Sequence, residues 1–150
     1  MLTFNVAGYE LLADRRYDPE THMWVDLDSD ARRAYIGLDP LGRETSGDVV
    51  ALSLREPGIA LRRGESFGDL EAAKFVGPLI TPLSGTLVAC NERVLSEPGV
   101  LNADPATHWL VALDVLDAAE LDGMLRGESE VADWFAAEVE RFRTNGAIAE

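Results

Sequence analysis

Turn-forming residues divide the first two thirds of the chain into short segments, and this spacing limits the possible folds more than any other feature. Five β-rich segments occupy residues 22–28, 32–38, 46–54, 58–68 and 78–94. An acidic turn within residues 26–31 joins the first two, whereas residues 1–16 follow no clear pattern. Short strands separated by turns at intervals of about ten residues are typical of a small barrel or sandwich. We therefore expect a mainly β fold.

The C-terminal part of the chain has helical periodicity instead. Asp117 is followed three residues later by Glu120, which is the pattern of a capping box. Beyond Glu128 the apolar residues that recur at helical spacing are Val131, Trp134, Phe135, Val139 and Phe142. Gly146 is expected just past the end of this helix. The pattern predicts helices over about 117–143 that pack against the β-body, in a single domain of residues 1–150 with its core at about 17–143.

Charge and composition exclude several classes of protein. The formal net charge of −14 disfavours nucleic acid and anionic membranes as partners, because both require basic surfaces. No apolar run approaches the roughly 20 residues of a membrane helix, and no basic region precedes an apolar core as in a signal peptide. Cys90 is the only cysteine, which favours a reducing cytoplasm. We expect a cytoplasmic monomer that docks on partners through acidic surface.

The sequence offers few groups for catalysis. His22 and His108 are far apart without metal-ligand spacing, so structural roles are expected for both. Cys90 lies in an apolar run and is expected to be a buried core thiol. Glu138 and Glu140 are expected on a solvated helix face. The predicted protein has no metal site and is not an enzyme that works alone.

Lys74 has an amine chemistry that none of the other basic residues of the chain can supply. Thirteen residues are Lys or Arg, and Lys74 is the only lysine among them. An arginine keeps its proton, whereas a lysine amine can lose it and form an amide with a carboxylic acid. Glu71 precedes Lys74 by three residues, and the segment between Gly68 and Gly77 allows a helical turn or a tight hairpin. A lysine at a hairpin tip would be accessible to a modifying enzyme.

The motifs around this lysine resemble the glycine cleavage system H protein family, which belongs to the lipoyl and biotinyl attachment-domain group. The family's Phe-Gly-x-x-Glu-Ser-Val-Lys motif is similar to residues 67–74, and its His-Glu-Trp-Val motif to residues 22–25. Further similar segments are residues 36–38, 46–50, 81–91 and 99–113. The resemblance rests on the order and spacing of these segments around one lysine, and it extends from about Tyr17 to the C-terminal helix.

The resemblance implies a barrel-sandwich hybrid with the lipoyl lysine on a β-hairpin. It places lipoate in amide linkage on Lys74, attached by a lipoate ligase or lipoyl transferase. Glu71, Gly68 and Phe75 would frame the hairpin for the attaching enzyme. The protein would be a non-catalytic carrier with a swinging arm, while Trp24, Trp109, Trp134 and Phe135 would belong to the core.

Three positions depart from the family and leave the cargo open. Two acidic residues and a histidine of the family correspond to Met23, Pro78 and Thr45, which we expect to line the resting place of the arm. A less polar pocket favours a sulfur cargo over a cationic amine. The partners would then be a heterodisulfide-reductase-like complex of bacterial sulfur oxidation and lipoamide dehydrogenase. The alternatives are a diverged carrier of the aminomethyl group for glycine cleavage enzymes, a lipoate relay, and an unmodified interaction scaffold.

Overall fold

The computed structural model describes residues 2–28, 30 and 32–149, and most of its regular elements are β-strands. The strands are β1 Thr3–Val6, β2 Tyr9–Leu12, β3 Arg16–Asp18, β4 Met23–Leu27, β5 Arg33–Leu38, β6 Val49–Leu54, β7 Ala60–Leu61, β8 Ser66–Ala72, β9 Val76–Ile80, β10 Gly85–Cys90, β11 Val111–Val115 and β12 Leu125–Arg126. The helical segments are α1 Pro40–Ser46, α2 Glu92–Ser96, α3 Val100–Ala103, the 3₁₀-helix η1 Ala118–Gly123 and α4 Glu128–Thr144.

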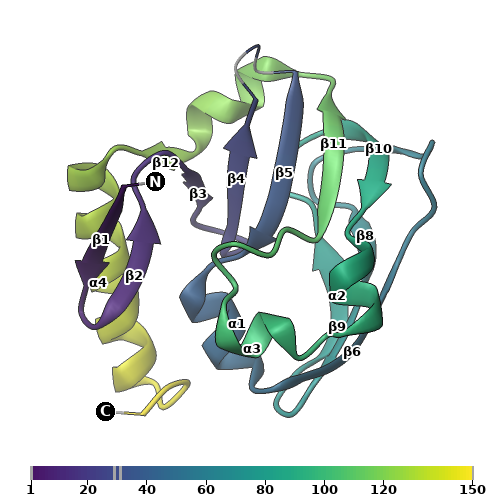
Figure 1. Cartoon of the computed structure of the whole chain (residues 1–150). Coiled ribbons are helices and arrows are strands. Elements are labelled where there is room, and N and C mark those ends of the chain that lie inside the picture. The colour runs from purple at the N-terminus through teal and green to yellow at the C-terminus, as the bar shows by residue number, and fades with distance from the viewer. Residues whose placement is uncertain (1, 29, 31, 150) are drawn as a thin grey trace.

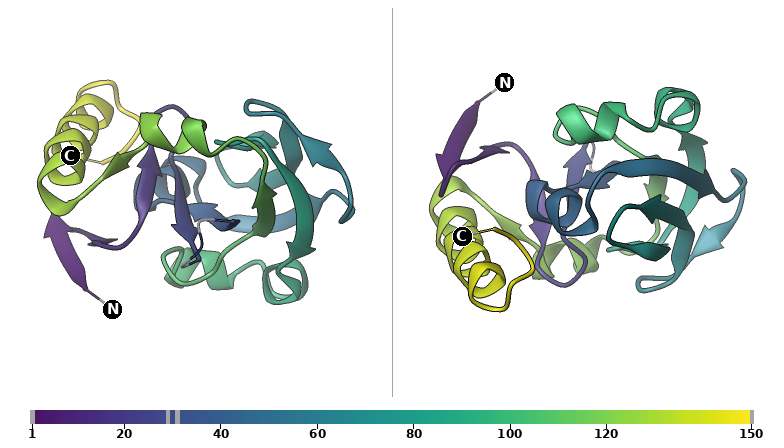
Figure 2. Two further views of the ribbon diagram at one scale, coloured as in Figure 1. Left: turned by 90° about the horizontal axis from the view of Figure 1, so that it is seen from above. Right: turned by 90° about the horizontal axis from the view of Figure 1, so that it is seen from below.

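The strands form two facing sheets and a separate N-terminal hairpin. One sheet has the order β12-β3-β4-β5-β11-β10-β7, the second has the order β6-β8-β9, and β1 pairs with β2. Every pairing is antiparallel. Seen from above and below, α4 lies at one end of the molecule and the three-stranded sheet at the other (Figure 2). The expected barrel-sandwich architecture is confirmed.

The main core fills the space between the two larger sheets. Val25 and Ile36 of the seven-stranded sheet belong to the same buried cluster as Val49, Leu70 and Leu79 of the three-stranded sheet. Along β8, the central strand of the three-stranded sheet, buried Leu70 and Ala72 alternate with exposed Asp69 and Glu71, as expected for a strand with one face toward the core. Burial of this apolar face holds the hairpin β8–β9 against the body of the fold.

The helix α4 lies beside the N-terminal hairpin (Figure 1), and a second core of buried side chains joins the two. Val131, Phe135 and Val139 repeat every four residues on α4 and are all buried. The ring of Tyr9 on β2 meets Phe135 edge-on, with centroids 5.5 Å apart. The helix ends at Thr144, and a glycine with positive φ follows two residues later, so the expected helix and its stop are confirmed.

The capping box expected at Asp117 is absent, and a 3₁₀-helix begins there instead of an α-helix. The side chain of Asp117 does accept a hydrogen bond from the amide of Ala119. The carboxylate of Glu120, however, accepts from the amide and hydroxyl of Ser84, at 2.6 and 2.9 Å. Because a tertiary contact uses this carboxylate, it does not cap the local helix, and the one long C-terminal helix is α4.

Local capping also overrides the strand expected up to residue 94. Strand β10 ends at Cys90, and the side chain of Asn91 then accepts from the amide of Arg93 to begin α2. Strands β4 and β5 agree with the sequence expectation. Of the acidic turn between them, Ser29 and Ala31 lie outside the described residues.

The expected core aromatics differ in burial, and the expected core thiol lies at the edge of the core. Trp24 and Phe135 are buried, whereas Trp109 and Trp134 are half-buried beside them. Cys90 is also half-buried, and its thiol donates to the carbonyl of Arg55. Burial and the nearby acidic side chains raise the pKa of this thiol. The prediction of a buried thiol was therefore wrong, because the end of β10 is only partly covered.

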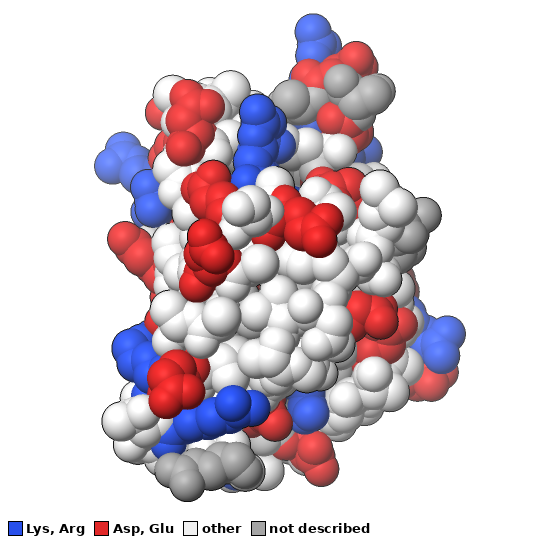
Figure 3. All heavy atoms as spheres, turned by 90° about the vertical axis from the view of Figure 1, so that its left-hand side faces the viewer, with Lys and Arg blue, Asp and Glu red and all other residues white. Residues whose placement is uncertain are grey.

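The surface of the described residues carries charges of both signs. On the face that holds α4 and the N-terminal hairpin, acidic and basic side chains surround a wide uncharged area (Figure 3). The net negative charge is therefore not gathered into one patch on this face. None of the described helices is both long enough and apolar enough to cross a membrane.

Candidate functional site

Lys74 lies at the tip of the hairpin formed by β8 and β9. The last paired residues before the tip are Glu71 and Val76. The amide of Ala72 donates to the carbonyl of Phe75 at 2.9 Å, which closes the turn. The Lys74 side chain is exposed. The fold therefore presents the amine to an enzyme that would modify it.

The backbone after α1 holds this tip in place. The amide of Lys74 donates to the carbonyl of Ser46 at 2.8 Å, and the amide of Ala73 donates to the carbonyl of Asp48 at 2.9 Å. Gly47, between these two acceptors, has φ of +77° and ψ of −170°. A Cβ on Gly47 would lie 3.1 Å from the amide nitrogen of Lys74. The backbone conformation requires glycine, and the space leaves little room for a Cβ.

The role of Gly47 was not predicted from the sequence, although the residue lies within a segment that resembles the family. The available signal was the glycine itself, directly after a potential helix end at Ser46. The bonds it permits join Lys74 to Ser46 and Ala73 to Asp48, which are distant in the sequence, so no local pattern could identify its partner.

Gly47→Ala is expected to displace the hairpin tip. An alanine in this backbone conformation costs about 1–3 kcal/mol, which the chain can relieve by moving the tip. The lipoylation of Lys74 that the family resemblance implies should then be slower, measured with a lipoate ligase as the fraction of lipoylated protein over time by intact mass. Gly99→Ala is the matched control, because a Cβ there meets nothing within 4 Å. Equal lipoylation rates in both variants would contradict an anchoring role for Gly47.

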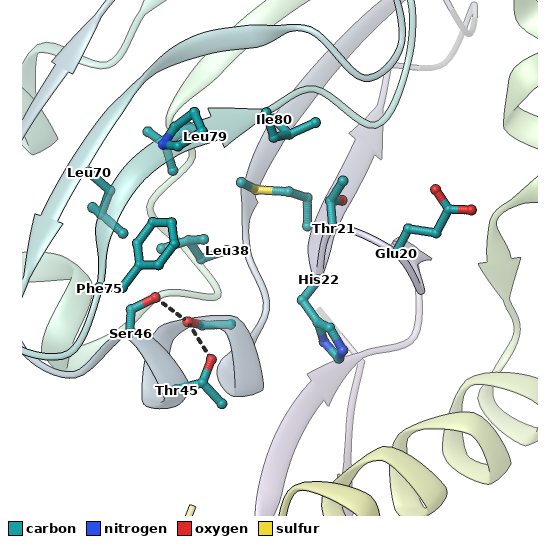
Figure 4. A pocket seen from close by; sticks show the side chains of 13 residues that line it. Glu20, Thr21, His22, Leu38, Thr45, Ser46, Leu70, Phe75, Leu79 and Ile80 are labelled. Atoms are coloured by element: carbon teal, nitrogen blue, oxygen red, sulfur yellow. Dashed lines mark hydrogen bonds between the residues drawn. The ribbon is translucent and has the colours of Figure 1, made fainter. Parts of the chain in front are cut away.

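A cleft of about 470 Å³ lies beside the hairpin (Figure 4). Its lining comes from the start of β4, the end of β5, α1 and both hairpin strands. The lining residues are Glu20, Thr21, His22, Met23, Leu38, Gly42, Thr45, Ser46, Leu70, Phe75, Pro78, Leu79 and Ile80. The structure thus brings together Met23, Thr45 and Pro78, the three residues expected to line the resting place of the arm, and adds Phe75.

The polar groups of this cleft are mostly satisfied by the protein itself. The hydroxyl of Thr45 donates to the carbonyl of Leu41 at 2.9 Å, and that of Ser46 donates to the carbonyl of Gly42 at 2.8 Å. Glu20 is the one carboxylate among the lining residues. It is exposed, and it lies 3.9 Å from the guanidinium of Arg63. The wall of the cleft is therefore apolar or internally hydrogen-bonded, with acidic charge only at its rim.

Glu71 and Gly68 lie elsewhere on the hairpin. Glu71 is exposed on the opposite face of the sheet, where it lines a smaller groove of about 340 Å³ together with Asp69 and Val76. Gly68 is buried, and a Cβ on it would lie 2.2 Å from the carbonyl oxygen of Ser53. Gly68 therefore permits close pairing of β6 and β8, whereas the side chain of Glu71 is accessible to solvent.

His22 connects the cleft to α4. Its Nδ1 lies 2.7 Å from a carboxylate oxygen of Asp39, and its Nε2 lies 2.9 Å from one of Glu138. Trp134 stacks on the ring at 5.2 Å. Since both carboxylates only accept, the doubly protonated imidazole completes both bonds. The structural role expected for His22 agrees with this burial, but Glu138 is not on a solvated face as expected, because it is turned inward to His22.

Stability is expected to fall as pH rises through the titration of His22. Burial opposes the charged ring, but hydrogen bonds to Asp39 and Glu138 outweigh it and raise the pKa of His22 above its ordinary 6.5. A folded-state pKa above the unfolded value gives stability that is complete below about pH 6.5 and lost above the raised pKa. Urea unfolding at several pH values between about 6 and 9 measures this loss of unfolding free energy.

Two neighbouring glutamates of α4 provide the variant and the control for this pH dependence. Glu138→Gln removes a carboxylate that holds His22 and also Arg141, which donates to it at 2.8 Å. The fall in stability with pH should become shallower in this variant. Glu140→Gln lies two residues away on the exposed face and should behave as the wild type. Equal slopes in both variants would contradict the assignment.

Comparison with known proteins shows the family to which the chain belongs. The glycine cleavage H-protein family matches the chain over residues 15–137. The probable glycine cleavage system H protein of Haloarcula marismortui is 36% identical over 119 residues, which cover 79% of this chain and 91% of that protein. The glycine cleavage system H protein of Acidobacterium capsulatum is 32% identical over 75% of this chain and 85% of that protein.

A solved structure extends the agreement to the fold. The crystal structure of a glycine cleavage system H protein from Mycobacterium marinum superposes with a TM-score of 0.66 at 27% sequence identity. The superposition covers 82% of this chain and 98% of the other. By sequence and by fold, the chain belongs to the glycine cleavage H-protein family, whose members are lipoyl carriers.

Proposed function

We propose that this carrier bears lipoate in amide linkage on Lys74 and transports sulfur species between partner enzymes. Exposure of the only lysine at an anchored hairpin tip supports the attachment. Amide formation joins Nζ of Lys74 to the activated carboxyl carbon of lipoate, and the activating group and an amine proton leave. When bound, lipoate supplies a cyclic disulfide that opens to two thiols and exchanges groups at its sulfurs.

The residues of the chain have binding and positioning roles. Lys74 holds the cofactor, Glu71 is accessible to a lipoate ligase or lipoyl transferase, and the cleft offers a resting place next to the hairpin. Partner enzymes supply the chemistry, so no residue of this chain is assigned a catalytic role. The lone cysteine is consistent with a reducing cytoplasm, which we include in the proposal.

The apolar wall of the cleft is the observation that carries the proposed cargo. Met23 is buried there, Pro78 forms part of the rim, and the Thr45 hydroxyl is already engaged. A protonated amine loses its hydration in such a site without gaining a partner, which is costly. A neutral or weakly hydrated sulfur group fits better. The corresponding partners would be a heterodisulfide-reductase-like complex and lipoamide dehydrogenase.

A second candidate function is transport of the aminomethyl group between glycine cleavage enzymes. Two observations favour it: the relatives above are described as glycine cleavage H proteins, and the carboxylate of Glu20 lies at the rim of the cleft. An exposed carboxylate could accept a hydrogen bond from a cationic amine at the mouth of the cleft. This candidate differs from the first in cargo but shares the lipoyl-lysine.

Intact mass of the protein from its native host, grown on reduced sulfur, tests the proposal. Fragmentation should locate a lipoyl group on Lys74 with additional sulfur on the arm. A lipoyl group that takes up only aminomethyl in the presence of glycine would support the second candidate. Transfer of the lipoyl group itself to other proteins would indicate a relay, and an unmodified Lys74 would leave an interaction scaffold.

A double variant separates the two cargoes in vitro. Met23→Glu with Pro78→Asp places carboxylates at both positions where the family has acidic residues. If the apolar wall selects sulfur, the double variant should gain aminomethyl loading and lose sulfur loading relative to the wild type. Unchanged preference in the variant would show that the wall does not select the cargo.

A further inference from the structure

The ring of Phe75 lines the cleft next to the attachment point. Phe75 directly follows Lys74, and its side chain lines the cleft together with Leu38 and Leu70 (Figure 4). The next residue, Val76, lines the groove on the other face of the sheet and is 78% exposed. Phe75 itself is 40% exposed, so one part of the ring meets solvent and the other part faces the cleft.

Gly77 provides the seat for this ring. A Cβ on Gly77 would lie 2.9 Å from Cζ of Phe75 and 3.4 and 3.5 Å from its two Cε atoms. Gly77 has no positive φ, so its backbone conformation is open to alanine. A larger residue at position 77 would therefore take the space that the Phe75 ring occupies, without straining the backbone.

From these contacts we infer that Phe75 is a positioning residue, a gate that retains the lipoyl arm in the cleft and shields its sulfurs from solvent. The inference rests on the proposed attachment of lipoate to Lys74. Phe75 directly follows Lys74 and lines the cleft, so an arm that enters the cleft along the hairpin lies beside this ring. Aromatic rings make favourable contacts with sulfur and with methylene chains, so the seated ring stabilises the retracted arm. Displacement of the ring should expose the thiols.

The test measures how fast a neutral alkylating reagent reacts with the reduced arm. Wild type, Phe75→Ala, Gly77→Ala and the double variant are lipoylated in vitro, checked by intact mass, reduced, and treated with iodoacetamide. Loss of one aromatic contact should raise the alkylation rate roughly threefold to tenfold in Phe75→Ala. Gly77→Ala should give a similar rise, because its methyl group displaces the ring that Phe75→Ala deletes.

The double variant and a control make the result specific. If both changes act through the ring, the double variant should alkylate no faster than Phe75→Ala alone. Val76→Ala should react as the wild type, because that side chain faces the other groove. Phe75→Tyr should retain slow alkylation, since it keeps the ring. Gly77→Ala supplies the measurement if Phe75→Ala fails to fold.

The outcomes separate failure of the gate from failure of the proposed function. A lipoylated wild type with equal alkylation rates in all variants would overturn the gate alone. A fast Phe75→Ala with a wild-type rate in Gly77→Ala would also overturn it, because the seat would then be irrelevant. Absence of a lipoyl group on Lys74 in the wild type would overturn the attachment and the gate together.

Discussion

Lys74→Arg is expected to abolish lipoylation completely and leave the stability of the fold unchanged. A guanidinium stays protonated and does not form the amide, so no modified protein should be detected by intact mass. Lys74 is exposed at the hairpin tip, and its backbone contacts do not depend on the side chain. The free energy of unfolding should therefore change by no more than about 0.5 kcal/mol.

A relocated lysine provides the control for this loss. The double variant Lys74→Arg with Arg93→Lys keeps one lysine but places it on α2, where Arg93 is exposed and pairs with Glu97 at 3.6 Å. We expect this variant to remain unmodified, because the hairpin and its anchored tip are missing around the new lysine. Lipoylation at position 93, or at another site in Lys74→Arg, would show that the hairpin does not select the lysine.

Phe135→Ala is expected to have the largest effect on stability. The ring is fully buried between α4 and the N-terminal hairpin and meets Tyr9 and Trp134 edge-on. Truncation of a buried Phe costs about 3–5 kcal/mol, a large part of the roughly 5–15 kcal/mol of a typical domain. Urea unfolding followed by circular dichroism should show the loss directly.

A surface substitution on the same helix separates this packing loss from a change in helix propensity. Glu140→Ala lies on the exposed face of α4 and should change the free energy of unfolding by less than about 0.5 kcal/mol. If Phe135→Ala were as mild as Glu140→Ala, the second core would contribute little to the fold. Such a result would contradict the packing of α4 described above.

Elements with a regular local pattern could be predicted from the sequence. The helix α4 was predicted from apolar residues such as Val131, Phe135 and Val139, because an apolar stripe at helical spacing is buried against a core. Strands β4 and β5 followed from β-rich segments with turns at their ends. The short helix α2 and the 3₁₀-helix η1 did not, because in such short segments a single side-chain contact decides the outcome, as Asn91 and Glu120 show.

The candidate site was only partly predictable. The motif around Lys74 identified the attachment lysine, because the unusual residue and the family resemblance lie within one short segment. Cys90 and Glu138 were placed wrongly, because burial at the end of a strand or on one side of a helix depends on what packs there. The pairing of His22 with Glu138 spans 116 residues and carries no local signal.

The sequence by itself therefore determined a mainly β chain with one modifiable lysine between two strands and one long amphipathic helix. The tertiary structure alone decided where the tip is anchored, which side chains line the cleft beside the expected Met23, Thr45 and Pro78, and that Phe75 rests on Gly77. The physical reason is the distance along the chain over which each kind of interaction acts. Periodicity and turn chemistry act between near neighbours, whereas the charge and shape of a cleft arise from strands that meet only when the two sheets pack together.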